Sequence, residues 1–414
     1  MPFRCLPRSA SASHVHVVVV GASLAGLRAA QALRGEGFAG LLTVVGAEAH
    51  LPYRRPPLSK ELLSGTLHRD QLLLGTDAEL EARWLVGRRA VALDPGRREV
   101  VLEDGEPLGF DGLVIATGAA AKRLPNVPNL EGVHVLRTLE DATALHEALG
   151  RGRPRVVVVG AGFIGSEVAS SCRALGVEVT VVDPLPRPLA SLGPMVGEAC
   201  AGLQRDHGVD LRLGCSVLDV EGRTCVERVR LSDGTTVDTE LVVTGIGVTP
   251  ATGWLQGSGL LLDDGVVCDE TLAVSGCEGV VAAGDVARWP HRLFDRRLIR
   301  LEHWTNAVEQ GAAAAKTLLA GTGGGEPFAT VPSMWSDQFD VRIQSVGLPR
   351  FADDAIVVEG SVEERRFLVV YVERGRVVGA VGFDMPRALA AARVLVARRA
   401  SINELRAKAV GARA

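Results

Sequence analysis

The chain of 414 residues has few aromatic residues, few lysines and no long apolar run. Aromatic side chains make up only 4% of it, and lysine occurs four times among 45 basic residues. No stretch approaches the roughly 18 uninterrupted apolar residues that a membrane-spanning helix requires. The leader MPFRCLPRSASASH lacks the apolar centre of a signal peptide. We therefore expect a cytoplasmic protein that does not bind membranes.

The cysteines show no pattern typical of a thiol or metal site. Their number is odd, they are scattered, and no pair has the C-x-x-C spacing of structural zinc or of a dithiol redox pair. This argues against a disulfide framework and predicts no metal site and mostly reduced, inert core thiols. The seven residues are Cys5, Cys172, Cys200, Cys215, Cys225, Cys268 and Cys277.

An excess of positive charge is also missing. The net charge is −4, so no global basic field exists that would hold nucleic acid. Hydrophobic residues make up 47% and charged residues 23%, as expected for a globular chain of two or three domains. Glycine, in contrast, is abundant, with 48 residues.

Part of this glycine lies in two copies of the same β-α-β pattern. In the first copy, the apolar run 14–20 leads into the turn 21–26 (GASLAG), a helical pattern 27–34 and a second strand 41–45. In the second copy, the run 156–159 leads into the turn 160–165 (GAGFIG), a helix to residue 175 and the strand 177–182. The pattern predicts a duplicated supersecondary unit.

A glycine turn between a strand and a helix suits a pyrophosphate, because free backbone N–H groups and the positive end of the helix dipole meet there. Each turn is followed at a suitable distance by an acid: Glu48 lies 22 residues after Gly26, and Asp183 lies 18 residues after Gly165. Two dinucleotide sites are therefore predicted. FAD, held tightly, and NADH, as the diffusible hydride carrier, form the natural pair.

The two copies differ in detail. Ser23 occupies the second glycine position of the first turn, whereas the second turn is intact. Asp183 favours NAD over NADP, because an acid there accepts from both ribose hydroxyls and repels a 2′-phosphate. The nearby Arg187 is either a residue that accommodates that phosphate or an ordinary surface charge.

Further segments resemble buried strands that end in glycine turns. They are followed by a helical pattern over 305–319, a glycine break at 321–325, alternating strands at 355–358 and 367–372, and terminal helices at 386–399 and 402–408. The strand-turn segments are 113–118, 241–250 and 279–287, and a proline-rich linker covers 124–130.

The order of these segments resembles the FAD-dependent NADH:ferredoxin reductases of the oxygenase-coupled class, the putidaredoxin and rhodocoxin reductases. The most specific string is Arg-Pro-Pro-Leu-Ser-Lys, which ends at Lys60. The other matching strings cover residues 17–26, 113–118, 136–142, 160–165, 244–250, 281–285, 306–310 and 335–338.

The resemblance implies an α/β fold with two Rossmann-like dinucleotide-binding domains, as in glutathione-reductase-like flavoproteins, and a small α+β C-terminal domain. The FAD domain would be discontinuous, 1–118 and 250–325. The NAD domain would cover 119–249 and the C-terminal domain 326–414.

The resemblance also implies where FAD binds. Asp285 would accept from the ribityl chain, and a helix N-cap is an alternative or additional role. The helix from near residue 305 would aim its positive end at the flavin, Trp304 and Trp335 would line the ring, and Glu48 would replace the acid that often stands at Ala47. The implied FAD residues are Gly21, Ser23, Leu24, Ala25, Gly26, Ala47, Glu48, Arg55, Lys60, Ala90, Thr117, Gly118, Arg137, Gly284, Asp285, Trp304 and Trp335.

For NADH, the resemblance implies the second glycine turn, Asp183 and a turn at 245–247 whose glycines would let nicotinamide stack flat on the flavin. Lys60 and Glu167 would form an ion pair at the reactive edge of the flavin; the alternative is a solvated lysine and a helix-face glutamate. The implied NADH residues are Gly160, Gly162, Phe163, Ile164, Gly165, Glu167, Asp183, Gly245, Ile246 and Gly247.

The implied function is hydride transfer from NADH to FAD, followed by single-electron transfer to a [2Fe-2S] ferredoxin that serves a cytochrome P450 or a multi-component oxygenase. Ferredoxin would dock on local basic charge, for which Arg292, Arg296, Arg297 and Arg300 are candidates, or these are solvated charges.

Alternatives remain open. They are a rubredoxin reductase, an NADH oxidase-type flavoenzyme, and a non-enzymatic NADH-sensing flavoprotein resembling apoptosis-inducing factor. Thiol chemistry is disfavoured, because residues 48–80 contain no cysteine. The sequence leaves the oligomeric state open.

Overall fold

The computed structural model describes residues 14–75, 80–125, 127, 130–321 and 323–404. The chain forms two compact units, each assembled from three stretches of sequence. The first unit comprises Met1–Arg54, Leu73–Ala120 and Thr249–Thr330; the second comprises Arg55–Leu72, Ala121–Val248 and Val331–Ala414. The predicted division into three domains stays a prediction.

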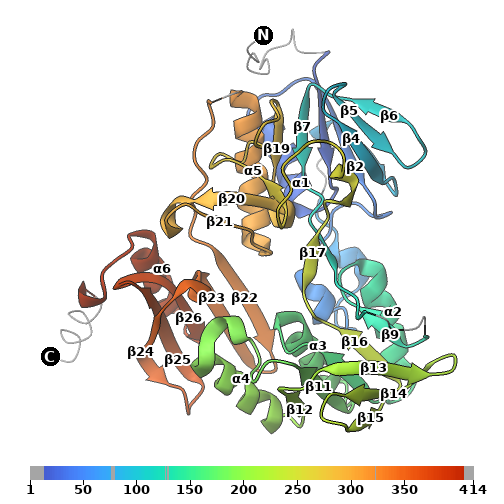
Figure 1. Cartoon of the computed structure of the whole chain (residues 1–414), viewed down its shortest axis with the longest axis vertical. Helices are drawn as coiled ribbons and strands as arrows, with labels where there is room; N and C mark the ends of the chain where they lie inside the picture. Colours follow the sequence, from blue (N-terminus) through green and yellow to red (C-terminus); the bar gives the residue numbers. More distant parts are fainter. Residues whose placement is uncertain (1–13, 76–79, 126, 128–129, 322, 405–414) are drawn as a thin grey trace. The chain divides into compact units, whose positions relative to one another are not determined.

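A parallel sheet forms the centre of the first unit (Figure 1). Its central strands are largely apolar, and residues 17–20 of β1 and 113–115 of β7 are almost completely buried, as a parallel sheet covered on both faces requires. The strand order is β19-β7-β1-β2-β3. The strands are β1 (His16–Val20), β2 (Leu41–Gly46), β3 (Arg83–Val86), β7 (Gly112–Ile115) and β19 (Val280–Ala282).

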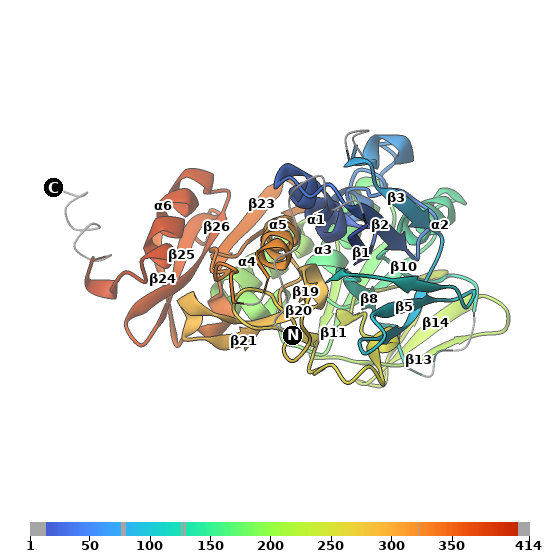
Figure 2. The same ribbon diagram turned by 90° about the horizontal axis from the view of Figure 1, so that it is seen from above.

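Helices α1 (Leu24–Gly35) and α5 (Trp304–Ala320) lie side by side in this unit, as Figures 1 and 2 both show. A glycine permits this approach, because a methyl group added at Gly311 would lie 2.4 Å from the Ala25 carbonyl oxygen. The unit also contains β4 (Ala90–Asp94), β5 (Glu99–Leu102), β6 (Pro107–Gly109), β18 (Val266–Val267), β20 (Ala287–His291), β21 (Arg297–Ile299) and the short helices η6 (Gly253–Leu255), η7 (Gly284–Val286) and η8 (Arg292–Phe294).

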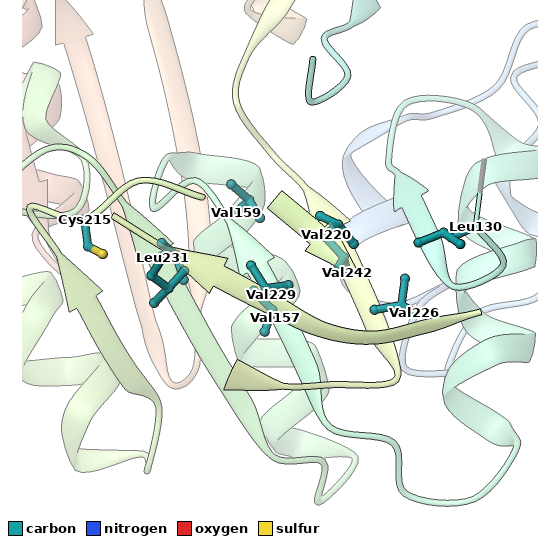
Figure 3. Packing of buried hydrophobic residues seen from close by; sticks show 10 residues of the cluster. Leu130, Val157, Val159, Cys215, Val220, Val226, Val229, Leu231 and Val242 are labelled. Carbon is teal, nitrogen blue, oxygen red and sulfur yellow. The ribbon is translucent and has the colours of Figure 1, made fainter. Parts of the chain in front are cut away.

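The second unit repeats the parallel sheet, with the strand order β12-β11-β10-β16-β9. Figure 3 shows its core, in which Val157 and Val242 of the sheet pack against Val229 and Leu231 of a small antiparallel sheet. The strands are β9 (Val133–Val135), β10 (Val156–Val159), β11 (Val179–Asp183), β12 (Asp210–Leu213) and β16 (Leu241–Thr244), with β13 (Val217–Gly222), β14 (Val226–Leu231) and β15 (Thr236–Asp238) in the small sheet.

The helices of this region are α2 (Leu139–Gly150), α3 (Phe163–Ala174) and α4 (Gly193–Asp206). Both predicted β-α-β units are confirmed. Strand β1 pairs in parallel with β2, to which α1 connects it, and β10 pairs in parallel with β11, to which α3 connects it. The remaining short elements are η2 (Pro56–Ser59), η3 (Arg69–Leu72), η5 (Ala190–Leu192), β8 (Ala119–Ala121) and β17 (Val248–Pro250).

The C-terminal part of the second unit is an antiparallel sheet with one helix, α6 (Pro386–Ala397), seen again in Figure 2. The strand order is β22-β23-β26-β25-β24, and the predicted strands at 355–358 and 367–372 are confirmed within it. The predicted helix at 402–408 lies largely outside the described residues. The elements are β22 (Ser333–Gln338), β23 (Val341–Gly347), η9 (Pro349–Phe351), β24 (Asp354–Ser361), β25 (Arg366–Glu373) and β26 (Arg376–Phe383).

Within the described part of the chain, none of the helices is both long and apolar enough to cross a membrane.

Candidate functional site

The two glycine turns have the same local geometry. The first glycine of each has a positive φ, +125° at Gly21 and +104° at Gly160, which L side chains rarely adopt. The third glycine brings the helix close to the strand, because a methyl group at Gly26 or Gly165 would lie 1.9 Å from the carbonyl oxygen of the first glycine. The fold itself therefore requires glycine at these four positions.

The fold does not require a glycine at the middle position of the second turn. Gly162 has an ordinary φ of −74°, and a methyl group added there would meet only the Gly245 carbonyl oxygen, at 4.0 Å. Ser23 occupies the corresponding position of the first turn and carries a Cβ there. A bare backbone at Gly162 thus leaves space in front of the turn, as a dinucleotide pyrophosphate needs.

The helices that follow the glycine turns have no acidic side chain in their first turn that would offset the positive end of the helix dipole. This holds for residues 24–27 of α1 and for residues 163–166 of α3. The helix α2 of the same protein is different, because Thr138 and Asp141 form a capping box at its N-terminus. The two turns therefore fit the pyrophosphates of FAD and NADH.

Asp183 ends β11 beside the second turn and is nearly buried, with 9% of its surface exposed. Its Oδ2 accepts from the Ala161 N–H at 2.6 Å, and its Oδ1 accepts from the Leu185 N–H at 2.7 Å. Each carboxylate oxygen keeps a lone pair for a ribose hydroxyl. Arg187 pairs with Glu198 at 3.6 Å on the neighbouring helix α4.

The acid predicted beside the FAD adenosine has a partner that sequence reasoning missed. The hydroxyl of Tyr53 donates to Glu48 Oε2 at 2.5 Å, and Tyr53 is buried. Ala47 is exposed, and Ala90 begins β4 in the same unit. Glu48 thus has a fixed orientation, although its contact with ribose stays a prediction.

Asp285 lies inside the short helix η7, whose N-cap is Ala283, so the predicted N-cap role of Asp285 is wrong. The turn before it is held by α5, because Gln310 Oε1 accepts from the Gly284 N–H at 2.8 Å. A methyl group at Gly284 would lie 2.9 Å from the Ala25 Cβ at the start of α1. The turn that carries Asp285 thus lies against α5 and against the start of α1, both in the first unit.

The remaining residues predicted for FAD lie in both units. In the second unit, Arg55 donates through Nη1 to the Arg137 carbonyl oxygen at 2.6 Å. Trp335 is half-buried in β22 of the same unit. In the first unit, the Thr117 hydroxyl donates to the Ala251 carbonyl oxygen at 2.9 Å, and Trp304 is the first residue of α5.

Lys60 and Glu167 lie together in the second unit. Lys60 Nζ is 2.9 Å from Glu167 Oε2, and the exposed fractions of the two side chains are 15% and 5%. The carboxylate also accepts from the hydroxyls of Ser59 at 2.5 Å and Ser336 at 2.8 Å. The lysine is therefore not solvated and the glutamate does not lie on a bare helix face; their role beside a flavin stays a prediction.

The predicted nicotinamide turn has local reasons for its glycines. A methyl group at Gly245 would lie 3.2 Å from the Gly165 nitrogen, and Gly247 has a φ of +92°. The Gly247 carbonyl oxygen accepts from the Lys122 N–H at 3.0 Å. That this turn, with Ile246 at its centre, leaves room for nicotinamide to stack on the flavin stays a prediction.

Arg292, Arg296 and Arg300, which were named as candidates to dock ferredoxin, each form an ion pair within the protein. Arg292 and Arg296 both contact Glu270, at 2.6 Å and 3.3 Å. Only 9% of the Arg300 side chain is exposed, and it pairs with Asp264 and Glu302. Burial disfavours its charge, but these carboxylates raise the pKa of Arg300 overall. Arg300 is thus not available to a docking partner, and docking at the others stays a prediction.

Most described cysteines are core thiols, as predicted. Burial raises the pKa of Cys172 and of Cys200 to about 12, and it also raises the pKa of Cys268. Cys225 is exposed, Cys277 is half-buried, and Cys5 lies outside the described residues. In the described chain, no three His, Cys, Asp or Glu residues are grouped so that they would hold a metal ion.

Comparisons with known proteins match two families. Residues 15–311 match "Pyridine nucleotide-disulphide oxidoreductase", and residues 333–410 match "Reductase C-terminal". Rhodocoxin reductase of Rhodococcus erythropolis is 36% identical over 92% of this chain and 89% of its own length. The ferredoxin reductase component of chlorobenzene dioxygenase from Cupriavidus sp. is 37% identical over 94% of each chain.

Solved structures agree with these matches. The covalent putidaredoxin reductase–putidaredoxin complex contains a chain that is 33% identical and superposes with a TM-score of 0.89, over 95% of this chain and 96% of that chain. This likeness confirms the predicted fold class, two Rossmann-like domains and a small C-terminal domain.

Proposed function

Because the chain belongs to the pyridine nucleotide-disulphide oxidoreductase family and, within it, to the ferredoxin reductases, we propose that it oxidises NADH and reduces a [2Fe-2S] ferredoxin. That ferredoxin serves a cytochrome P450 or a multi-component oxygenase. The observation in the chain that carries the proposal is the pair of glycine turns, each of which opens a helix without acid in its first turn. A cytoplasmic location belongs to this proposal, because NADH is supplied there.

When bound, FAD supplies the redox chemistry, since it takes a hydride and releases electrons singly. The residues of this chain bind and orient the two nucleotides. The first turn, Glu48 and Asp285 would hold FAD, and the second turn and Asp183 would hold NADH. No acid–base pair is required for hydride transfer, so the protein acts mainly through positioning and electrostatics.

Preference for NADH over NADPH is part of the proposal. Asp183 is fixed by two backbone N–H groups and would repel a 2′-phosphate. Arg187, the residue that would accommodate that phosphate, is paired with Glu198. We expect a lower KM for NADH than for NADPH in steady-state assays with the same ferredoxin.

Lys60 is proposed to act at the edge of the flavin through its pair with Glu167. We expect Lys60→Met to slow the reduction of bound FAD by NADH in stopped-flow absorbance, because a partly buried cation beside the ring is lost. Lys316→Met is the control, since Lys316 is exposed and pairs only at 3.4 Å with Glu36. An unchanged reduction rate in Lys60→Met would reject this role.

The electron acceptor separates the proposal from its alternatives. Steady-state NADH oxidation is measured with a [2Fe-2S] ferredoxin, with rubredoxin and with oxygen alone. The proposal requires fast turnover with the ferredoxin. Fast turnover only with rubredoxin indicates a rubredoxin reductase, full turnover without any carrier indicates an NADH oxidase, and no turnover with any acceptor indicates a binding protein.

A further inference from the structure

The carboxylate of Glu167 is held by more than its lysine. Glu167 is 4% exposed, and three donors from two segments of the second unit reach it. Ser59 and Lys60 donate to Oε2 at 2.5 Å and 2.9 Å, and Ser336 donates to Oε1 at 2.8 Å. Ser336 therefore donates a hydrogen bond to the carboxylate oxygen that does not accept from the lysine.

The direction of the Ser336 hydrogen bond is set by a second buried side chain. Gln338 Nε2 donates to Ser336 Oγ at 3.2 Å, and both residues are completely buried. An amide N–H occupies a lone pair of the hydroxyl, so the single hydroxyl hydrogen is left to point at Glu167. The chain of donors runs from Gln338 through Ser336 to the carboxylate.

The segments that carry these groups are tied to α3, on which Glu167 lies. Helix α3 packs against both β22 and η2. The Ser171 hydroxyl donates to the Ser59 carbonyl oxygen at 2.7 Å, and the Phe339 N–H donates to the Ser170 hydroxyl at 2.7 Å. These contacts keep Ser336 and Ser59 in place on both sides of the carboxylate.

We propose that Ser336, oriented by Gln338, is a positioning residue that holds the Glu167 carboxylate in the geometry in which it pairs with Lys60. The inference rests on the proposed function for the value of that pair in catalysis, and it assigns a part of the site to the C-terminal sheet. If a buried, charged carboxylate loses one of its hydrogen-bond donors, its orientation is less well fixed. Its ion pair with the lysine is then weaker.

Other charges on the packed segments do not replace this bond. Glu61 follows Lys60 in the sequence, and Asp337 of β22 is paired with Arg342 at 2.6 Å. Asp183, on the strand after α3, accepts from the Ala161 and Leu185 N–H groups. The Glu167 carboxylate is therefore expected to respond mainly to its own three donors.

The test uses the small number of lysines. The chain has only four, at positions 60, 122, 316 and 408, so the FAD-loaded protein labelled with ¹³C-lysine shows four Cε signals by NMR. The Lys60 signal is assigned by its loss in Lys60→Met. The chemical shift of this signal at neutral pH then reports on the carboxylate that Lys60 contacts.

In Ser336→Ala we expect the Lys60 Cε signal at neutral pH to move away from its wild-type position, towards its position in Glu167→Gln. We also expect flavin reduction by NADH to slow about tenfold, with the KM for NADH changed less than twofold, as for lost positioning. Ser336→Thr keeps the hydroxyl and should restore both values.

Ser345→Ala is the matched control, because Ser345 is also a buried serine in the same sheet, opposite Met334 of β22. It should leave the Lys60 signal at its wild-type position. If Ser336→Ala does not fold, Ser336→Cys retains the volume with a weaker donor, and its Lys60 signal is expected between those of the wild type and Glu167→Gln.

A Lys60 signal in Ser336→Ala, or in Ser336→Cys, at its wild-type position would overturn the inference. The outcome is distinct from failure of the proposed function. If Lys60→Met is reduced by NADH at the wild-type rate, the pair has no catalytic role, whether or not Ser336 holds Glu167. If only the NMR result fails, the pair keeps its role and Ser336 has none in it.

Discussion

Replacement of Gly162 by alanine separates what the fold needs from what a nucleotide needs. The added methyl group would meet one described atom within 4 Å, the Gly245 carbonyl oxygen at 4.0 Å, and the backbone φ of −74° suits any residue. We therefore expect no loss of stability, and a gain of about 0.4–1 kcal/mol from the lower entropy of the unfolded chain.

Binding of NADH should respond in the opposite direction. The methyl group fills the space into which the pyrophosphate approaches the turn, and it covers the first N–H groups of α3. If the phosphate is displaced enough to lose one charge-assisted hydrogen bond, the cost is about 1.5–3 kcal/mol. The Kd for NADH should then rise by roughly tenfold to a hundredfold.

Binding is measured by calorimetric titration of the oxidised, FAD-loaded protein with NAD⁺. Reduction of the bound FAD is measured by stopped-flow absorbance at increasing concentrations of NADH. Thermal unfolding is measured on the same samples. Gly150→Ala is the control, because Gly150 ends α2 in the same unit and also has open space around its Cβ position. Gly165→Ala provides the contrast, since its methyl group would lie 1.9 Å from the Gly160 carbonyl oxygen and should lower stability.

The reasoning is refuted if Gly162→Ala binds NAD⁺ and NADH with wild-type affinity while its FAD content and melting temperature are unchanged. In that case the second turn is not the pyrophosphate site. A fall in melting temperature like that of Gly165→Ala would show that the space at Gly162 is already required by the protein itself.

Three further predictions follow from the same contacts. Asp183→Ala should weaken NADH binding at least tenfold with little loss of bound FAD, and equal loss of both in a spectroscopic titration would contradict the assignment of the second turn. His291 is buried with Nε2 at 3.0 Å from the Thr330 carbonyl oxygen and Nδ1 accepting from the Leu293 N–H, and burial lowers the pKa of His291 to about 4. The unfolded chain binds this proton below about pH 6.5, so stability should fall by about 2 kcal/mol between pH 7.5 and pH 5; a His291→Gln variant with the same pH dependence of its melting temperature would refute this. In the native protein, a thiol reagent should label the exposed Cys225 quickly and Cys172 only after unfolding, because burial raises the pKa of the Cys172 thiol; mass spectrometry of the modified peptides decides.

The β-α-β units, the glycine turns and the fold class were predictable from the sequence, because each depends on residues close together in the chain. Val17–Val20 and residues 156–159 are apolar throughout, and the glycines between strand and helix have their own signature. Nearby charges were less predictable. Arg300 was one of the candidates for docking a partner. Its Nη2 instead pairs with Asp264, which lies 36 residues earlier in the sequence, and its Nη1 pairs with Glu302. Likewise, the short helix η7 places Asp285 two residues beyond its N-cap, Ala283.

The sequence by itself determined the family and the two glycine turns, because the relevant residue types stand at fixed positions in local motifs. The pair of Lys60 and Glu167 was implied by the resemblance to the ferredoxin reductases. Only the tertiary structure decided what surrounds that pair. Ser59 and Ser336 lie 277 residues apart and share no motif, and folding brings both hydroxyls to the same carboxylate. The physical reason is that a buried charge must be satisfied by whichever donors the packed elements bring to it, whatever their distance in sequence.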